Sequence, residues 1–175
     1  MSRLLYHLSY AAIECMELPQ YTSASFSCQQ RTLTRRIIDS TILTRMTHTT
    51  ELTTRSYECD GYGHINNAVY LNYLEYARIQ FLDALPVPYA ELRSRGVGFV
   101  VARVCIDYRR QVESGQTLRI ETRPIQKQKA RMVFLQSVYR DAELVAEAQV
   151  TWACINERGA PIRIPPELDI PELEP

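Results

Sequence analysis

The stretch that decides the fold runs from residue 60 to residue 78 and reads D-G-Y-G-H-I-N-N-A-V-Y-L-N-Y-L-E-Y-A-R. It begins with a carboxylate, Asp60, in a glycine-rich turn, and Asn66 and Asn67 then offer side chains that favour the N-cap of a helix. Apolar residues at helical spacing follow, and Pro86 ends the pattern. The stripe consists of Leu71, Leu74, Arg78, Phe81 and Leu85, widened by Tyr70, Tyr73, Ala77 and Ile79. Because the apolar residues cover most of its circumference, this segment is expected to form a long buried helix.

Segments with the pattern of β-strands lie on both sides of this helix. They are residues 47–57 before it and residues 98–108, 117–125, 130–140 and 144–155 after it. In the third segment Leu118, Ile120 and Thr122 alternate with charged residues, which is typical of a strand with one buried face. Short turns between alternating strands predict an antiparallel meander. The sequence therefore predicts an α+β domain in which a five-stranded antiparallel sheet wraps around one long buried helix.

Composition narrows the functional classes. The chain has 175 residues, of which 46% are hydrophobic and 23% charged, with 20 basic and 20 acidic side chains. That balance is typical of a globular domain and gives no basic field for nucleic acid. No apolar run reaches the roughly 18–20 residues that would span a membrane. The five cysteines form no C-x-x-C pair, so neither a disulfide framework nor a zinc site is expected, and reduced thiols favour a cytoplasmic protein.

The first 45 residues differ from the rest. They contain six Ser, five Thr and five Arg but only three acidic residues, without clear periodicity. We expect residues 1–45 to be a disordered leader and residues 46–175 to be the domain. The leader is either an upstream extension of a gene model whose true start is Met46, which we favour, or a targeting extension of the transit-peptide kind.

Asp60 is the first candidate for catalysis. It would stand at the end of a strand, just before a helix whose first N–H groups have no internal partners and carry partial positive charge. An ester-type carbonyl pointed at those N–H groups would have its oxyanion stabilised while Asp60 attacks or activates water. A glycine such as Gly63 would let the backbone approach a substrate closely. Alternatively, Asp60 only shapes its loop as an Asx-turn.

The stretch from residue 60 to residue 78 resembles the signature of the 4-hydroxybenzoyl-CoA thioesterase-like branch of hotdog proteins. The shared pattern is Asp, two variable residues, Gly-His-hydrophobic-Asn-Asn, then Tyr-Leu and Glu-x-Ala-Arg. Weaker similarity continues through residues 107–115 and 159–165. The resemblance implies a hotdog-fold hydrolase of acyl-CoA or acyl-carrier-protein thioesters. It also implies that no metal or redox cofactor is needed and that the active sites are shared between subunits of a homo-oligomer.

Site residues follow from this resemblance position by position. Asp60 matches the catalytic carboxylate, and Asn67 matches the position whose backbone N–H is the oxyanion donor. That position is a catalytic His in one branch, so the role of the Asn67 side chain stays open. His64 aligns with a His of plant acyl-carrier-protein thioesterases, whose Asn two residues earlier is Tyr62 here. Direct attack by Asp60 and general-base action assisted by His64 both remain open, as does a structural role for His64.

Other candidates have two interpretations each. Glu75 could position a water molecule or pair with Arg78, three residues along the helix. Lys127, Lys129 and Arg131 alternate; if one strand runs through them, they form a row that binds CoA phosphates or a solvated strand end. The tyrosines, including Tyr70, and Trp152 belong either to the core or to the wall of an acyl pocket.

Two rival functions remain within the same fold. A hotdog hydratase or dehydratase would need an Asp followed by Asn-Pro and His, which residues 60–64 lack. A non-catalytic acyl-CoA-binding protein would not need the Asp-x-x-Gly-His loop. The two edge strands of a five-stranded sheet, together with the resemblance, predict a homodimer or homotetramer.

Overall fold

Five strands and one long helix form the core of the part that the computed structural model describes, residues 47–175. The strands are β1 (His48–Thr53), β2 (Gly98–Tyr108), β3 (Thr117–Lys127), β4 (Arg131–Arg140) and β5 (Glu143–Ile155). The helices are α1 (Val69–Asp83), α2 (Tyr89–Ser94) and three 3-10 turns, η1 (Ser56–Glu58), η2 (Pro166–Leu168) and η3 (Pro171–Leu173). The leader predicted for residues 1–45 lies outside the described residues.

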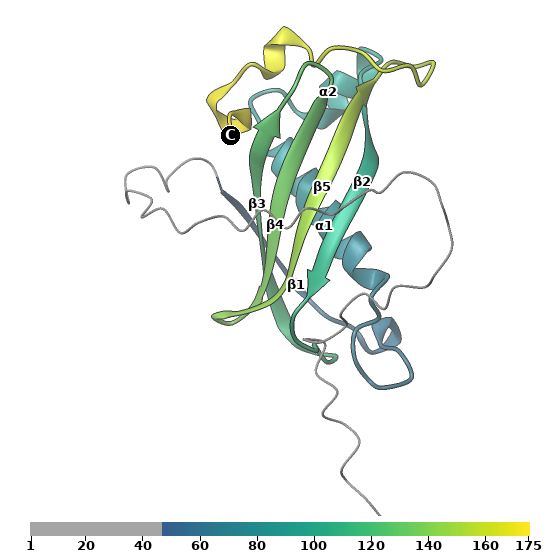
Figure 1. Ribbon diagram of the computed structural model, residues 1–175, viewed down its shortest axis with the longest axis vertical. Helices are drawn as coiled ribbons and strands as arrows, with labels where there is room; N and C mark the ends of the chain where they lie inside the picture. The colour runs from purple at the N-terminus through teal and green to yellow at the C-terminus, as the bar shows by residue number, and fades with distance from the viewer. Residues whose placement is uncertain (1–46) are drawn as a thin grey trace, which may run out of the picture. The chain divides into compact units, whose positions relative to one another are not determined.

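The sheet has the strand order β1-β3-β4-β5-β2 and is antiparallel throughout (Figure 1). The predicted five-stranded antiparallel sheet is confirmed, and β2 begins and ends where the sequence places it. The predicted meander holds for β3, β4 and β5 but is wrong for β2, which pairs with β5 and not with β3. Alternation shows which face of a strand is buried, but it does not identify the neighbouring strand.

Helix α1 connects the two edge strands of the sheet and therefore crosses one face of it (Figure 1). Leu74, Ala77 and Phe81 of the helix are buried, and Phe81 packs edge-on against Phe134 of β4. Burial of each large side chain contributes roughly 1.5–3 kcal/mol. A sheet wrapped around a helix is the architecture of the hotdog fold, as the sequence predicts.

The helix is less enclosed than its composition indicates. Leu71 and Ile79, both assigned to the apolar stripe, are 43% and 40% exposed. The side facing away from the sheet has no cover within residues 47–175, because a single sheet of this size wraps only one side of a helix. The expectation of burial around most of the circumference is wrong for that side.

Arg78 points into the core. Its Nη1 donates to Oε1 of Gln136 at 2.8 Å, and Gln136 in turn donates to the carbonyl of Leu74 and to Oγ1 of Thr122, both at 3.0 Å. The guanidinium also lies over the ring of Trp152, and its burial lowers the pKa of Arg78 to about 10. The expected ion pair with Glu75 is absent among the described residues, since Glu75 stays on the exposed side of the helix.

The ends of the elements follow the prolines. Helix α1 ends at Asp83, before Pro86, and Pro88 occupies the N-cap position of the short helix α2, which the sequence did not predict. The irregular tail packs on the domain through the buried side chains of Leu168 and Leu173. Within residues 47–175, no helix combines the length and apolar character needed to cross a bilayer.

Candidate active site

The loop between β1 and α1 carries Asp60, His64 and Asn67, and backbone hydrogen bonds fix it on both sides. The N–H of Ile65 donates to the carbonyl of Val112 at 2.8 Å, and the N–H of Asn66 donates to the carbonyl of Glu58 at 2.9 Å. Ile65 itself is buried. The loop is thus attached to the domain at its centre, while residues 61–63 project into solvent.

Asp60 closes the first turn of this loop with one carboxylate oxygen. Its Oδ1 accepts hydrogen bonds from the N–H of Tyr62 at 2.9 Å and of His64 at 3.3 Å. Gly63 adopts a φ of 80°, in the region that glycine tolerates best, and donates its N–H to the carbonyl of Asp60 at 3.0 Å. The Asx-turn interpretation is therefore confirmed for Oδ1. Within residues 47–175, Oδ2 has no hydrogen-bond donor, so this oxygen is available to a substrate or water.

The helix begins differently from the prediction. Ala68, and not an asparagine, occupies the N-cap position and makes no side-chain cap. Oδ1 of Asn66 accepts the N–H of Ala68 at 2.9 Å, and the carbonyl of Asn66 accepts the N–H of Val69 at the same distance. The exposed Asn67 has no acceptor for its own N–H in the part of the chain that the structure describes. An unsatisfied N–H directly before the N-cap of a helix is suited to binding an oxyanion.

Tyr108, at the end of β2, binds the same loop from the other side. Its hydroxyl donates to the carbonyl of Asn67 at 2.8 Å, and its ring packs edge-on against Tyr70 with centroids 5.3 Å apart. Tyr70 is only 3% exposed and also packs against Tyr73. Of the two interpretations given to Tyr70, the structure therefore places its ring in the core beneath the loop.

A buried carboxylate that the sequence analysis missed supports the loop from below. Oε2 of Glu58 accepts the hydroxyl of Tyr73 at 2.6 Å and the N–H of Arg55 at 2.7 Å. Burial alone would raise the pKa of Glu58, but these hydrogen bonds, from Tyr73 first and then Arg55, bring it below its ordinary value. The spacing of Arg55 and Glu58 is the signal that could have indicated a capping contact, which the structure contains.

The side chains of the two remaining candidates, His64 and Glu75, make no hydrogen bond within residues 47–175 that would assign them a role. His64 is half-buried and pairs through its backbone with Glu113, while its imidazole makes no hydrogen bond within residues 47–175. Glu75 is exposed on α1. Across residues 47–175, no cluster of three or more His, Cys, Asp or Glu side chains has metal-site geometry.

The basic residues proposed to bind CoA phosphates lie away from the Asp60 loop. Lys127 ends β3, Lys129 lies in the turn and Arg131 begins β4, so the continuous strand assumed for them does not exist. Lys127 is held in ion pairs with Asp169 and Glu174 of the tail, at 2.7 and 2.6 Å. The start of β3 is next to the Asp60 loop, because the backbone of Thr54 in that loop is hydrogen-bonded to Gly115 and Gln116. The β3–β4 hairpin is at the other end of β3, so it lies one strand length, about 33 Å, from the loop.

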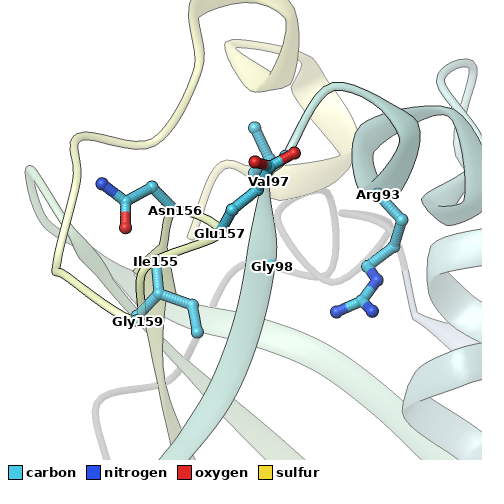
Figure 2. A pocket seen from close by; sticks show the side chains of 8 residues that line it. Arg93, Val97, Gly98, Ile155, Asn156, Glu157 and Gly159 are labelled. Atoms are coloured by element: carbon cyan, nitrogen blue, oxygen red, sulfur yellow. The ribbon is translucent and has the colours of Figure 1, made fainter.

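A pocket of about 370 Å³ also lies at the far end of the sheet from Asp60. Figure 2 shows it at the start of β2, between Arg93 of α2 and the turn that follows β5. Its lining consists of Arg93, Gly96, Val97, Gly98, Ile155, Asn156, Glu157 and Gly159. In one chain, the full length of β2 separates this pocket from Tyr108 and the loop that Tyr108 holds.

Comparison with known proteins identifies the family. The sequence profile of the thioesterase-like superfamily matches residues 54–170, which include the Asp60 loop, α1 and the strands β2 to β5. The chain belongs to the thioesterase-like superfamily. This membership confirms the resemblance, and with it the hotdog fold.

Among curated proteins similar to this chain, the acyl-acyl carrier protein thioesterase ATL2 of Arabidopsis thaliana is 29% identical over 120 residues. That match covers 67% of this chain and 64% of the plant protein, so the chain spans less than two thirds of that relative. The long-chain acyl-CoA thioesterase FadM of Escherichia coli is 32% identical over 110 residues, 61% of this chain and 82% of FadM. A probable thioesterase from Bartonella henselae superposes with a TM-score of 0.65 at 29% identity, covering 68% of this chain and 99% of that protein.

Proposed function

We propose that this chain hydrolyses acyl thioesters to a carboxylic acid and a thiol, with Asp60 as the catalytic carboxylate. The observation that carries the proposal is the arrangement of the loop before α1. One oxygen of Asp60 is fixed by backbone N–H groups, the other is available, and the N–H of Asn67 in the same loop has no acceptor within residues 47–175. Membership in the thioesterase-like superfamily supports the same chemistry.

In the proposed reaction, the thioester carbonyl oxygen binds the N–H of Asn67, which stabilises the negative charge that develops on it. Oδ2 of Asp60 then either attacks the carbonyl carbon or removes a proton from an attacking water. Attack expels the thiolate and leaves an acyl-aspartyl anhydride that water hydrolyses; base catalysis expels the thiolate directly from the tetrahedral intermediate. His64, four residues from Asp60, could protonate the leaving thiolate in either route.

The proposed substrates are acyl esters of coenzyme A or of acyl carrier protein, the two classes named for FadM and ATL2. Both carry a phosphopantetheine arm. The exposed side chains of Lys129 and Arg131 are proposed to bind the CoA phosphates, whereas the ammonium of Lys127 is already neutralised by two carboxylates. Gly63 is proposed to allow close approach of the substrate, and Glu75 to position water.

A homodimer formed through β2 is part of the proposal. Among the strands of residues 47–175, this edge strand pairs only with β5, and Val100 and Val101 on it are 42% and 48% exposed. Antiparallel pairing of two β2 strands about a two-fold axis places the start of one strand beside the end of the other. The pocket at Arg93 and Gly98 of one copy would then lie near the Asp60 loop of its partner. The β3–β4 hairpin with Lys129 and Arg131 would likewise lie at the same end of the sheet as the partner's Asp60 loop.

A location in a reducing compartment, such as the cytoplasm, completes the proposal. Within residues 47–175, Cys59 and Cys154 form no disulfide, which supports it.

The direct test is a thiol-release assay with purified full-length protein. A panel of acyl-CoA esters of increasing chain length, and one aromatic ester, is incubated with a thiol reagent that reports free CoA. We expect release that is saturable and proportional to enzyme concentration for at least one chain length. Saturable binding of acyl-CoA without any thiol release would instead assign the chain to the non-catalytic acyl-CoA-binding class.

A further inference from the structure

The peptide that links Asn67 to Ala68 is held at both of its polar ends. Its carbonyl accepts the hydroxyl of Tyr108 at 2.8 Å, and its N–H donates to Oδ1 of Asn66 at 2.9 Å. The next peptide toward the N-terminus carries the N–H of Asn67, which has no acceptor within residues 47–175. Two side chains therefore fix the plane next to the proposed oxyanion donor, and one of them comes from a strand about forty positions further along the chain.

We propose that Tyr108 is a positioning residue for catalysis: its hydroxyl orients the N–H of Asn67 toward the substrate carbonyl by holding the carbonyl of Asn67. The inference rests on the proposed function, because it assigns a task to Tyr108 in the same reaction. Tyr108 does not touch the substrate in this account. It acts through the backbone of Asn67.

The placement of Tyr108 suits this task. Its ring is fixed by edge-on packing against the buried Tyr70, and its backbone is paired with Ala146 of β5. Burial raises the pKa of Tyr108, so the hydroxyl keeps its proton, and with it the hydrogen bond, throughout the neutral range. Rotation of the 67–68 peptide would break both hydrogen bonds at once. The adjoining peptide, which carries the N–H of Asn67, is itself held by the hydrogen bond from the N–H of Val69 to the carbonyl of Asn66. With both peptides held, the direction of this N–H is set before substrate binds. A donor oriented in advance needs no reorganisation when charge develops.

Tyr108→Phe removes only the hydroxyl, and its effect should fall on the transition state. Complete loss of an oxyanion donor lowers kcat about 100- to 1,000-fold, so misorientation of one should lower kcat roughly 10-fold or more. KM should stay within about 2-fold, because the ground-state carbonyl depends little on the donor. Asn66→Ala releases the other end of the same peptide and should give the same pattern. Tyr139→Phe is the matched control: Tyr139 is also half-buried in a strand, where its ring packs under the guanidinium of Arg119, and neither residue belongs to the proposed site.

Two non-hydrolysable CoA analogues separate positioning from a merely structural role. A thioether analogue mimics the bound substrate, and a trifluoromethyl ketone analogue, whose hydrate carries a tetrahedral oxyanion, mimics the intermediate. We expect Tyr108→Phe to weaken binding of the ketone by the same factor as kcat/KM and to leave binding of the thioether unchanged. Thermal unfolding of each variant accompanies these measurements.

Wild-type rates in Tyr108→Phe, or equal loss of affinity for both analogues, would overturn the inference while leaving the proposed function intact. If Tyr108→Phe unfolds, the decision passes to Asn66→Ala, and an unchanged ketone affinity in that variant overturns the inference. A wild-type protein that releases no thiol from any ester would instead overturn the proposed function, and this inference with it.

Discussion

Replacement of Tyr73 by Phe tests whether the buried contact beneath the Asp60 loop holds that loop on α1. The change removes one hydroxyl, which donates to Oε2 of Glu58 at 2.6 Å in a buried setting. Hydrogen bonds to charged groups contribute about 1.5–3 kcal/mol. Arg55 still donates its N–H to the same oxygen and Nη1 to Oε1, so the carboxylate keeps partners. The loss should therefore stay within that range, roughly 5–10 °C in Tm for a domain of this size.

The effect should also depend on pH. The pKa of Glu58 is lower in the folded protein than its ordinary value of about 4.3, so its ionised form contributes stability that is fully present above that value. This stability is lost as pH falls through the folded-state pKa. Because Tyr73 helps to lower that pKa, the difference between wild type and Tyr73→Phe should be largest near neutral pH and shrink in acid.

The assay is urea denaturation of both proteins between about pH 3 and about pH 7, a range that brackets the ordinary pKa of a glutamate. Tyr76→Phe is the matched control, since Tyr76 lies on the same helix but is 46% exposed. It should change stability by less than about 0.5 kcal/mol. A Tyr73→Phe loss no larger than that of the control, or one that does not change with pH, would refute the reasoning.

Two further predictions concern the substrate and the domain boundary. Replacing Lys129 and Arg131 by Gln should raise the Kd of CoA esters, measured by calorimetry, and leave esters truncated at pantetheine almost unaffected, because only the former carry nucleotide phosphates. Equal losses for both would assign the two side chains to the fold or the acyl pocket. A chain that begins at Met46 should match the full chain in Tm and thiol release, since β1 begins at His48. A substantial loss of either would place a needed element before residue 46.

The sequence predicts the elements better than their arrangement. The periodicity of residues 69–83 and the prolines behind it give α1 almost residue by residue, and alternation identifies the buried face of β3 and β5. These signals are local. The pairing of β2 with β5 is not, because it depends on α1 carrying the chain from one edge of the sheet to the other. The exposure of Leu71 and Ile79 is likewise decided by how far the sheet extends around the helix.

In the candidate site, too, residues that are adjacent in sequence are predicted and contacts between distant residues are not. Asp60 and Asn67 are recognised from a motif whose residues are adjacent in sequence, and the structure places them in one loop. The contacts that support this loop come from distant positions: Tyr73 reaches Glu58 across fifteen residues, and Tyr108 reaches Asn67 across forty-one. No periodicity or spacing connects such pairs. The row predicted for Lys127, Lys129 and Arg131 does not form, because it is inferred from local alternation alone. A hairpin turn ends β3 at Lys127 and begins β4 at Arg131, so the three residues do not share one strand.

The most direct test of the central claim is the thiol-release rate of Asp60→Asn, measured with the best ester of the acyl-CoA panel. Asn keeps the size of the side chain and an Oδ1 that can accept the N–H groups of Tyr62 and His64, but it can act neither as nucleophile nor as base. The account predicts that kcat falls by several orders of magnitude, while Tm and the affinity for a thioether analogue stay near wild type. Retention of more than about a tenth of the wild-type rate would contradict the assignment of Asp60 as the catalytic carboxylate.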